Sequence, residues 1–298
     1  MGWRTLYIEE SDNLSLYLDN IKVVRGANEL FFPLSDISVL LVDNTKTQLT
    51  IKLINACSSS NIPIISCGDD HHPIAILLPF FGHFESAKIQ NEQLLWTKEM
   101  KDIVWQNVIK AKISKQLFVL QRNKPKSEAI EYLSAYVNGV ESGDSTNREG
   151  LAAKAYFRSM FGNDFARNED NVINASLNYG YSVMRAIIAK VVVSKGLNPL
   201  FGIFHKGTTN SFNLVDDILE IYRPIIDDFV FKNFINEKIF KREHRLKVLT
   251  LINEKIEIQH QKQTLIHSIE IIVDDLINYF RKGEMCSNLF FDPILYDL

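Results

Sequence analysis

Residues 85–121 of the chain read ESAKIQNEQLLWTKEMKDIVWQNVIKAKISKQLFVLQ, and this stretch decides the fold class. It contains neither glycine nor proline, and apolar residues recur along it every three or four positions. This period predicts a long amphipathic helix. Further helices are expected at about 127–137, 147–160, 172–194, 214–235, 244–258 and 264–282.

The chain before this stretch has a different pattern. Short runs rich in β-branched and aromatic residues alternate with turn residues up to about residue 80, and a helix is expected at Leu49–Ser58 before a buried strand at Ile62–Ser66. The close spacing of the runs favours a small sandwich of hairpins over repeated βαβ units. The sequence therefore predicts an α+β protein: a small β-sandwich-like domain, residues 1–80, followed by a larger all-α domain, residues 86–298.

The overall composition is that of an ordinary globular chain. It has 298 residues, a formal charge of −3, 46% hydrophobic residues and 23% charged residues. Three scattered cysteines are too few for a disulfide framework or a zinc ribbon, which favours a reducing compartment. The N-terminus lacks the pattern of a signal peptide, and the longest apolar runs are too short to cross a membrane. We therefore expect a cytoplasmic protein with no membrane partner.

The distribution of charge is more informative than its total. Residues 1–85 hold 5 basic and 10 acidic residues, whereas residues 86–126 hold 9 basic and 3 acidic residues. A basic helix can follow a nucleic-acid backbone, although a solvated helix face is an equally good explanation. The candidates for contact with DNA are Lys98, Lys101, Lys110, Lys112 and Lys115. A second basic cluster, which the same two explanations fit, consists of Lys241, Arg242, Arg245 and Lys247.

Three motifs carry residues with metal-binding chemistry. Thr146 and Glu149 have the spacing of a capping box, so Glu149 has a structural explanation besides a functional one. His205 stands on a loop between two expected helices, where an imidazole is available as a ligand. Asp217 and Glu220 are three positions apart and share one helix face. One imidazole with carboxylates forms a mixed nitrogen and oxygen site that suits Mg²⁺ or Mn²⁺.

These motifs resemble those of the CRISPR-associated integrases, the Cas-one family, which inserts new spacers during adaptation. The resemblance covers essentially the whole chain and rests on four segments in the family's order. The segments are Asn147–Gly150, Asn174–Tyr181, Asn198–Gly207 and Phe212–Pro224. Many relatives have aspartate at the last acidic ligand, where this chain has Glu220. The run at residues 148–154 and the tail Phe291–Pro293 are most similar to the type II branch.

The resemblance implies a role for each residue of the site. Glu149, His205 and Glu220 would be the catalytic ligands of one Mg²⁺ or Mn²⁺, and Asp217 matches a family acid beside them. The 3′-hydroxyl of the spacer DNA would attack a phosphodiester, and water in its place would cut DNA. Candidates for contact with the phosphate are Arg148, Lys206 and Arg223.

The resemblance also implies a set of partners. Double-stranded spacer DNA and repeat-array DNA would be the substrates, and the β domain would form part of a homodimer. A dimer of the small Cas-two protein would bridge two homodimers. A type II member would also work with the guide-RNA nuclease and, in one subtype, with a ring-shaped DNA-end-binding protein. Two alternatives remain open: a non-catalytic DNA-binding subunit with this fold, and a hydrolytic nuclease acting on branched DNA or RNA.

Overall fold

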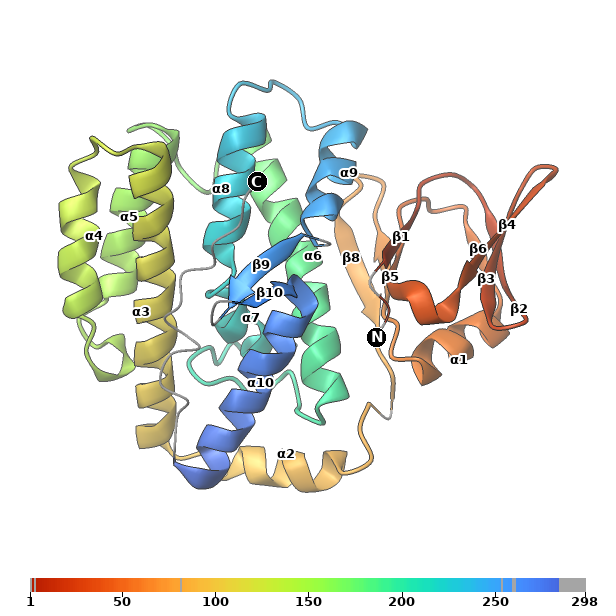
Figure 1. The fold of residues 1–298 in the computed structure, drawn as a ribbon, viewed down its shortest axis with the longest axis horizontal. Coiled ribbons are helices and arrows are strands. Elements are labelled where there is room, and N and C mark those ends of the chain that lie inside the picture. The colour runs from red at the N-terminus through yellow and green to blue at the C-terminus, as the bar shows by residue number, and fades with distance from the viewer. Residues whose placement is uncertain (1, 3, 81, 253, 259–260, 284–298) are drawn as a thin grey trace.

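A computed structural model describes residues 2, 4–80, 82–252, 254–258 and 261–283 of the chain (Figure 1). Strands dominate the N-terminal part and helices dominate the rest, which confirms the predicted fold class. The change falls between β8 (Pro73–Leu77) and α2 (Ser86–Leu94). The tail Phe291–Pro293, on which part of the type II resemblance rests, lies outside the described residues.

The N-terminal part contains two four-stranded sheets. The strand order of the first sheet is β1-β5-β7-β8, and that of the second is β4-β3-β2-β6. The first sheet comprises β1 (Arg4–Ile8), β5 (Ile37–Val42), β7 (Ile64–Cys67) and β8. The second comprises β2 (Asn13–Tyr17), β3 (Asn20–Arg25), β4 (Asn28–Pro33) and β6 (Gln48–Leu49), and a short 3₁₀ turn, η1 (Leu34–Asp36), leads from β4 to β5.

The expected hairpins account for three strands of the second sheet, to which β6 is added in parallel with β2, and for the antiparallel pair of β7 and β8 in the first sheet. The strands β2, β3 and β4 pair in antiparallel fashion, as hairpins do. In the first sheet, however, β5 pairs with both β1 and β7 in parallel, and α1 (Ile51–Ser59) lies in the crossover to β7. Every residue of β5 is buried. Such a continuous apolar run is typical of a parallel strand that is covered on both faces, and it carries no sign of hairpin pairing.

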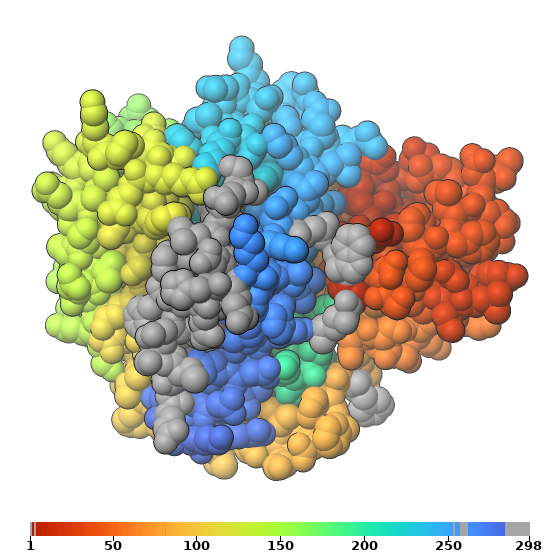
Figure 2. Space-filling view, viewed as in Figure 1, coloured from red at the N-terminus to blue at the C-terminus, as the bar shows by residue number. Residues whose placement is uncertain are grey.

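The first sheet is shared between two hydrophobic cores. Leu40 and Val42 of β5 face the small core between the two sheets, together with Leu53 of α1. Val39 and Leu41 belong to the large core of the helical part. The alternation of side chains along a strand therefore makes β5 the layer that joins both parts. Figure 1 shows this sheet between the helices and the second sheet, and Figure 2 shows the N-terminal part projecting from one side of the helical part.

Two of the expected long helices are interrupted. The helix expected from residue 85 divides into α2 and α3 (Lys98–Asn123), because the hydroxyl of Thr97 caps α3 by accepting from the backbone N–H of Met100 at 3.3 Å. The helix expected at 214–235 divides into α7 (Asn213–Leu219) and α8 (Arg223–Phe234), and Pro224 lies in the first turn of α8. The second break leaves Glu220 in the turn between two helices.

The helix α6 (Val172–Ser194) is the centre of the helical part. It packs against α7, α8, α9 and α10 and against strand β8. Residues on all its sides are buried, as expected for a helix that is apolar around most of its circumference. The remaining elements are α4 (Ala129–Asn138), η2 (Ser142–Asp144), α5 (Arg148–Phe161), α9 (Arg242–Leu251) and α10 (Leu265–Lys282).

The helical part also contains a hairpin that the sequence pattern did not predict. The strands β9 (Lys255–Ile258) and β10 (Gln261–Thr264) pair in antiparallel fashion. The helix expected at 244–258 therefore ends at Leu251, where the helical period gives way to the alternating sequence KIEI of β9. Among the described residues, no helix is both long and apolar enough to cross a membrane.

Candidate active site

The start of α5 presents Glu149 to the interior of the helical part. Asn147 is the N-cap residue, and its side chain accepts from the backbone N–H of Gly150 at 3.2 Å. The carboxylate of Asp144 accepts from the backbone N–H groups of Arg148 and Glu149 at 2.8 and 3.1 Å. The predicted capping box of Thr146 and Glu149 is therefore wrong. Because other side chains cap the helix, the Glu149 carboxylate is available to the site.

The turn between α7 and α8 presents Glu220. This side chain is buried, with 4% of the residue exposed, and its Oε1 accepts from Nε of Arg223 at 2.8 Å. Burial disfavours the ionised carboxylate, but the positive charges of Lys112 and Arg223 outweigh burial and lower the pKa of Glu220 below its ordinary value. Glu220 is therefore a buried carboxylate held in its charged form.

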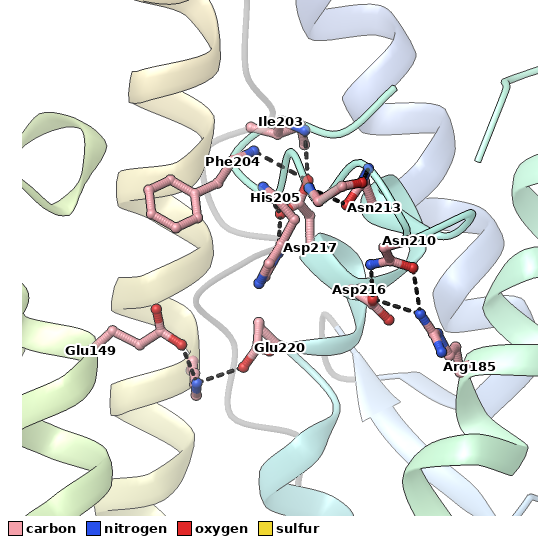
Figure 3. A network of polar contacts seen from close by, with 12 residues as sticks. Glu149, Arg185, Ile203, Phe204, His205, Asn210, Asn213, Asp216, Asp217 and Glu220 are labelled. Atoms are coloured by element: carbon pink, nitrogen blue, oxygen red, sulfur yellow. Dashed lines mark hydrogen bonds and ion pairs between the residues drawn. The ribbon is translucent and has the colours of Figure 1, made fainter. Parts of the chain in front are cut away.

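The loop before α7 presents His205, and Asp217 holds this loop in place (Figure 3). Asp217 is fully buried and accepts from the backbone N–H groups of Ile203, Phe204 and His205 at 2.5, 3.2 and 3.1 Å. Its Oδ1 also lies 2.7 Å from Nδ1 of His205, a contact that raises the pKa of His205 above its ordinary value. Since Asp217 engages Nδ1, Nε2 is the ring nitrogen left for a ligand.

An aromatic contact fixes the same loop against α3. The ring of Phe204 stacks on the indole of Trp105 with a centroid distance of 4.3 Å. The imidazole of His205 meets the same indole edge-on at 5.7 Å. Trp105 is itself almost completely buried. The histidine is thus positioned from two sides, by a carboxylate and by a rigid aromatic ring.

Lys112 of α3 lies between the two glutamates. Its Nζ is 2.6 Å from Oε1 of Glu149 and 2.5 Å from Oε2 of Glu220. The residue is 6% exposed, so Lys112 does not lie on an exposed basic face of the helix, and its contact with DNA stays a prediction. Burial favours the neutral amine, but the charges of Glu220 and Glu149 outweigh burial and raise the pKa of Lys112. The ammonium therefore remains charged inside the site.

The structure brings Glu149, Glu220 and His205 to one region between α3, α5 and α7 (Figure 3). Within the described ranges, no three His, Cys, Asp or Glu side chains stand close enough together to hold a metal ion. The ammonium of Lys112 lies between the two carboxylates in this arrangement. Two carboxylates and an oriented imidazole nonetheless have the donor chemistry that Mg²⁺ or Mn²⁺ requires. An ion between the two glutamates would require Lys112 to move aside.

A cavity of about 210 Å³ adjoins the two glutamates. Its lining residues are Lys112, Gln116, Glu149, Phe157, Arg167, Tyr181, Glu220, Arg223 and Asp227. The guanidinium groups of Arg167 and Arg223 lie 5.5 and 4.6 Å from the ring centroid of Tyr181. The phenol of Tyr181 donates to Asp227, whose burial raises its pKa to about 7. The cavity therefore combines acidic groups with positive charge, as a site for a phosphodiester requires.

Sequence reasoning did not assign roles to Arg167, Tyr181, Gln116 and Asp227. Tyr181 ends the Asn174–Tyr181 segment, so that motif carried a signal for this wall of the cavity. Arg167 is anchored by the same segment, since it donates to the side chains of Asn174 and Asn178. Nothing in the local sequence distinguishes Gln116 or Asp227 from ordinary core positions.

The other basic candidates fall into exposed and buried groups. Lys98 and Lys206 are exposed, whereas Lys101 and Lys110 are partly buried. Burial, and then the nearby charge of Lys206, lower the pKa of Lys101. Lys115 is 5% exposed, and its ammonium lies 5.8 Å from the ring centroid of Tyr222, so it does not lie on an exposed basic face, and its contact with DNA stays a prediction. Lys112 and Lys115 are three positions apart and share the helix face that points inward.

Two more basic side chains contact neighbouring aromatic or acidic groups. The guanidinium of Arg148 lies 5.6 Å from the ring centroid of Tyr136. That of Arg223 is partly buried beside Glu220, at the edge of the cavity. Of these two, Arg223 is the one that lines the cavity, so it has the better position for a phosphate.

The second basic cluster contacts the N-terminal sheets in part. Arg242 pairs with Glu9, the residue that follows β1. Nε of Arg245 lies 3.3 Å from Oδ2 of the buried Asp43. Lys241 and Lys247 are exposed. Half of this cluster therefore ties α9 to the sheets.

Comparison with known proteins identifies the family. The model of "CRISPR associated protein Cas1" matches residues 6–250. A CRISPR-associated endonuclease Cas1 of Neisseria meningitidis is 31% identical over 289 residues, which cover 95% of this chain and 92% of the relative. A second relative of that name, from Saccharolobus solfataricus, is 24% identical and covers 94% of this chain and 96% of its own.

Solved structures share the fold. A casposase bound to integration product superposes with a TM-score of 0.78 at 19% identity, covering 99% of this chain and 94% of its own. A complex named Cas6-RT-Cas1–Cas2 gives 0.77 at 16% identity, covering all of this chain and 36% of its own. A Cas1 protein from Thermotoga maritima gives 0.73 at 14% identity, covering 97% and 99%. From the family match and the Neisseria relative together, the chain belongs to the CRISPR-associated Cas1 family.

Proposed function

We propose that this protein is a metal-dependent DNA integrase that inserts double-stranded spacer DNA into a repeat array. The observation that carries the proposal is the convergence of Glu149, Glu220 and the oriented His205 beside a cavity with basic walls. Relatives named as Cas1 endonucleases, and a structural neighbour named as bound to integration product, support the same class of chemistry.

Glu149, His205 and Glu220 would hold one Mg²⁺ or Mn²⁺. A bound ion of this kind polarises the scissile phosphodiester and promotes deprotonation of the attacking 3′-hydroxyl. Asp217 keeps the imidazole in a ligating orientation. Arg223 and Arg167 bring positive charge to the cavity in which the phosphate would lie.

The reaction exchanges one phosphodiester for another. The 3′-oxygen of the spacer forms a bond to phosphorus, and the 3′-oxygen of the array strand leaves. Because no external energy source is required, positioning and charge stabilisation by the site supply most of the acceleration. With water as the nucleophile, the same site would cut DNA and give the endonuclease activity.

We also propose an assembly for the reaction. Two homodimers, formed in part through the N-terminal sheets, would be bridged by a Cas2 dimer so that two sites act on the two spacer ends. The structural neighbour whose name joins Cas1 with Cas2 supports this partner. We place the chain in the type II branch, with the guide-RNA nuclease and a DNA-end-binding ring protein as further partners, acting in the cytoplasm.

Strand transfer by purified variants tests the proposal. We expect His205→Ala and Glu220→Ala to lower integration of a labelled spacer duplex into a repeat-containing plasmid by about 100-fold or more, because each removes a metal ligand. Addition of EDTA should abolish the activity of the parent. Glu131→Ala, at an exposed position on α4, is the matched control and should retain activity.

Each alternative function has its own outcome in the same assay. If both ligand variants integrate as well as the parent, the protein is a non-catalytic DNA-binding subunit. A branched DNA substrate and an RNA substrate are supplied in parallel with the plasmid. Metal-dependent cleavage of these substrates without any joined product would show a hydrolytic nuclease instead.

A further inference from the structure

We propose that Lys112 is an internal cation that occupies the acidic site in the metal-free protein and couples metal binding to phosphate binding. The proposal rests on the proposed function, because it concerns the metal site formed by Glu149, His205 and Glu220. It adds an element that the metal ligands alone do not provide: a side chain that must leave before a divalent ion can enter.

The contacts of Lys112 show how completely it fills the position between the glutamates. Its ammonium bridges Oε1 of Glu149 and Oε2 of Glu220 at 2.6 and 2.5 Å, and only 6% of the residue is exposed. The three partners come from α3, from the start of α5 and from the turn after α7. One ammonium thus connects three elements at the point where they converge.

Electrostatic repulsion prevents the ammonium of Lys112 and a divalent ion from occupying the position between the two glutamates at the same time. The buried carboxylate of Glu220, with the partly exposed one of Glu149 beside it, requires a cation, because an unpaired buried charge is strongly unfavourable. Lys112 meets that requirement, together with Arg223 at Glu220. A divalent ion on the same carboxylate oxygens would lie within a few ångströms of the ammonium, where like charges repel strongly in a buried environment. The ion and the ammonium therefore compete for the two glutamates.

The cavity contains acceptors for the displaced ammonium. Gln116 lies one turn further along α3 on the same face, is 1% exposed and lines the same cavity as Lys112. Its Oε1 is buried and has no hydrogen-bond partner within the described part of the chain, and the same is true of Oδ2 of Asp227. A lysine side chain is long and flexible enough to reorient towards such groups.

A phosphate in the cavity would complete the exchange. When the carboxylates pass to the metal, the non-bridging oxygens of a phosphodiester can replace them as partners of the ammonium. Each ligand then favours the binding of the other: the metal takes the carboxylates from the ammonium of Lys112, and the phosphate takes the ammonium from the carboxylates. By linkage, DNA should strengthen metal binding, and the metal should strengthen DNA binding by the same factor.

Calorimetric titration with Mn²⁺ tests the inference directly. We expect Lys112→Gln to bind Mn²⁺ about tenfold tighter than the parent, because no ammonium has to be displaced. Lys115→Gln removes an equally buried charge from the same helix, at an ammonium that lies 5.8 Å from the ring centroid of Tyr222, so it should change the affinity much less. Equal affinities of the parent and Lys112→Gln, or an equal effect of Lys115→Gln, would overturn the inference.

A second variant covers the case in which Lys112→Gln does not fold. Lys112→Arg keeps the charge, and a guanidinium pairs with carboxylates at least as strongly as an ammonium, so Mn²⁺ binding should stay the same or weaken. Tighter binding by this variant would contradict competition. In the parent, a duplex with 3′-deoxy ends should raise Mn²⁺ affinity, and in Lys112→Gln this increase should shrink.

The metal site itself is tested by Glu149→Gln and Glu220→Gln in the same titration. If the parent binds Mn²⁺ and these variants do not, the two glutamates are ligands of the ion. The lysine variants alone then test whether Lys112 competes with the ion. If both variants bind Mn²⁺ as the parent does, the ion binds elsewhere. That result would overturn the metal site and, with it, the role assigned to Lys112.

Discussion

At the scale of the residue, Asp217 holds the histidine loop together. Its carboxylate accepts from three successive backbone N–H groups and contacts the imidazole of His205 as well. The side chain is completely buried, and burial raises the pKa of Asp217 above its ordinary value, while these bonds act in the opposite direction and reduce the cost of the charge. The geometry of the proposed ligand therefore depends on a residue that need not touch metal or DNA.

We expect Asp217→Asn to lower strand transfer by about 10- to 100-fold, because an amide cannot accept all of these bonds or fix the ring. The free energy of unfolding should fall by about 1–3 kcal/mol. Urea denaturation and the plasmid assay measure the two effects. Asp216→Asn is the matched control: Asp216 bonds to Arg185 and to Asn210 near the end of the loop, whereas Asp217 bonds to residues 203–205 and the imidazole. Equal losses in both variants would argue against a specific role of Asp217.

At the scale of the element, one lysine connects the central helix to the first sheet. Nζ of Lys190 on α6 donates to the backbone carbonyl of Ser38 on β5 at 2.8 Å, and both residues are buried. Burial lowers the pKa of Lys190 to about 8. An unfolded lysine keeps its proton to a pH of about 10.4, so the unfolded chain binds more protons between these values.

This difference predicts a gain in stability as the pH rises from about 8 to about 10. Below pH 8 both states are protonated, and the effect of pH disappears. The slope contributed by Lys190 is at most about 1.4 kcal/mol per pH unit. Buried Cys57 and Cys67, whose pKa burial raises to about 11 and about 12, act in the opposite direction. The measured quantity is therefore the difference between parent and Lys190→Met in urea denaturation at pH 7.5 and 9.5.

Lys190→Met should lack this contribution, so its stability relative to the parent should fall as the pH rises. The substitution also removes the bond to Ser38, but that loss changes the offset between the two proteins and not its dependence on pH. A constant offset between pH 7.5 and 9.5 would show that Lys190 titrates normally in the folded protein.

At the scale of the whole molecule, the basic segment 86–126 does not form one continuous surface. Two of its lysines, Lys112 and Lys115, point into the helical part, whereas Lys98 is exposed. Lys206, from the histidine loop, is also exposed and lies close enough to Lys101 to lower its pKa. The exposed positive charge of this region therefore comes from the start of α3, where Lys98 pairs with Asp102 at 3.5 Å, and from Lys206 of the loop.

We expect the double variant Lys98→Glu and Lys206→Glu to bind duplex DNA more weakly and with a smaller dependence on salt. Each phosphate contact that is lost should lower the slope of log K against log[salt] by about one. Fluorescence anisotropy of a labelled duplex between 50 and 200 mM salt would measure the affinity and its slope. The control reverses two exposed charges of the other cluster, Lys241→Glu and Lys247→Glu. If the control alone lowers the slope, DNA passes over α9.

The sequence by itself determined those features that depend on neighbours along the chain. The apolar period predicted α6 with its observed limits, and the order of four motifs indicated Glu149, His205, Asp217 and Glu220 together. The cap of α5 is predicted less well from the sequence. Thr146, Asn147 and Asp144 all have suitable side chains, and in the structure Asp144 and Asn147 accept from the first N–H groups of the helix.

Only the tertiary structure decided which surfaces face inward and which strands pair. Lys112 meets Glu149 across 37 positions of the chain, and the parallel pairing of β5 with β7 depends on a crossover that hairpin signals do not report. A helical pattern gives the spacing of side chains but not the partners on the opposite side. Burial and ion pairing are set by packing between distant segments, and this is why a lysine predicted at the DNA surface lies inside the acidic site.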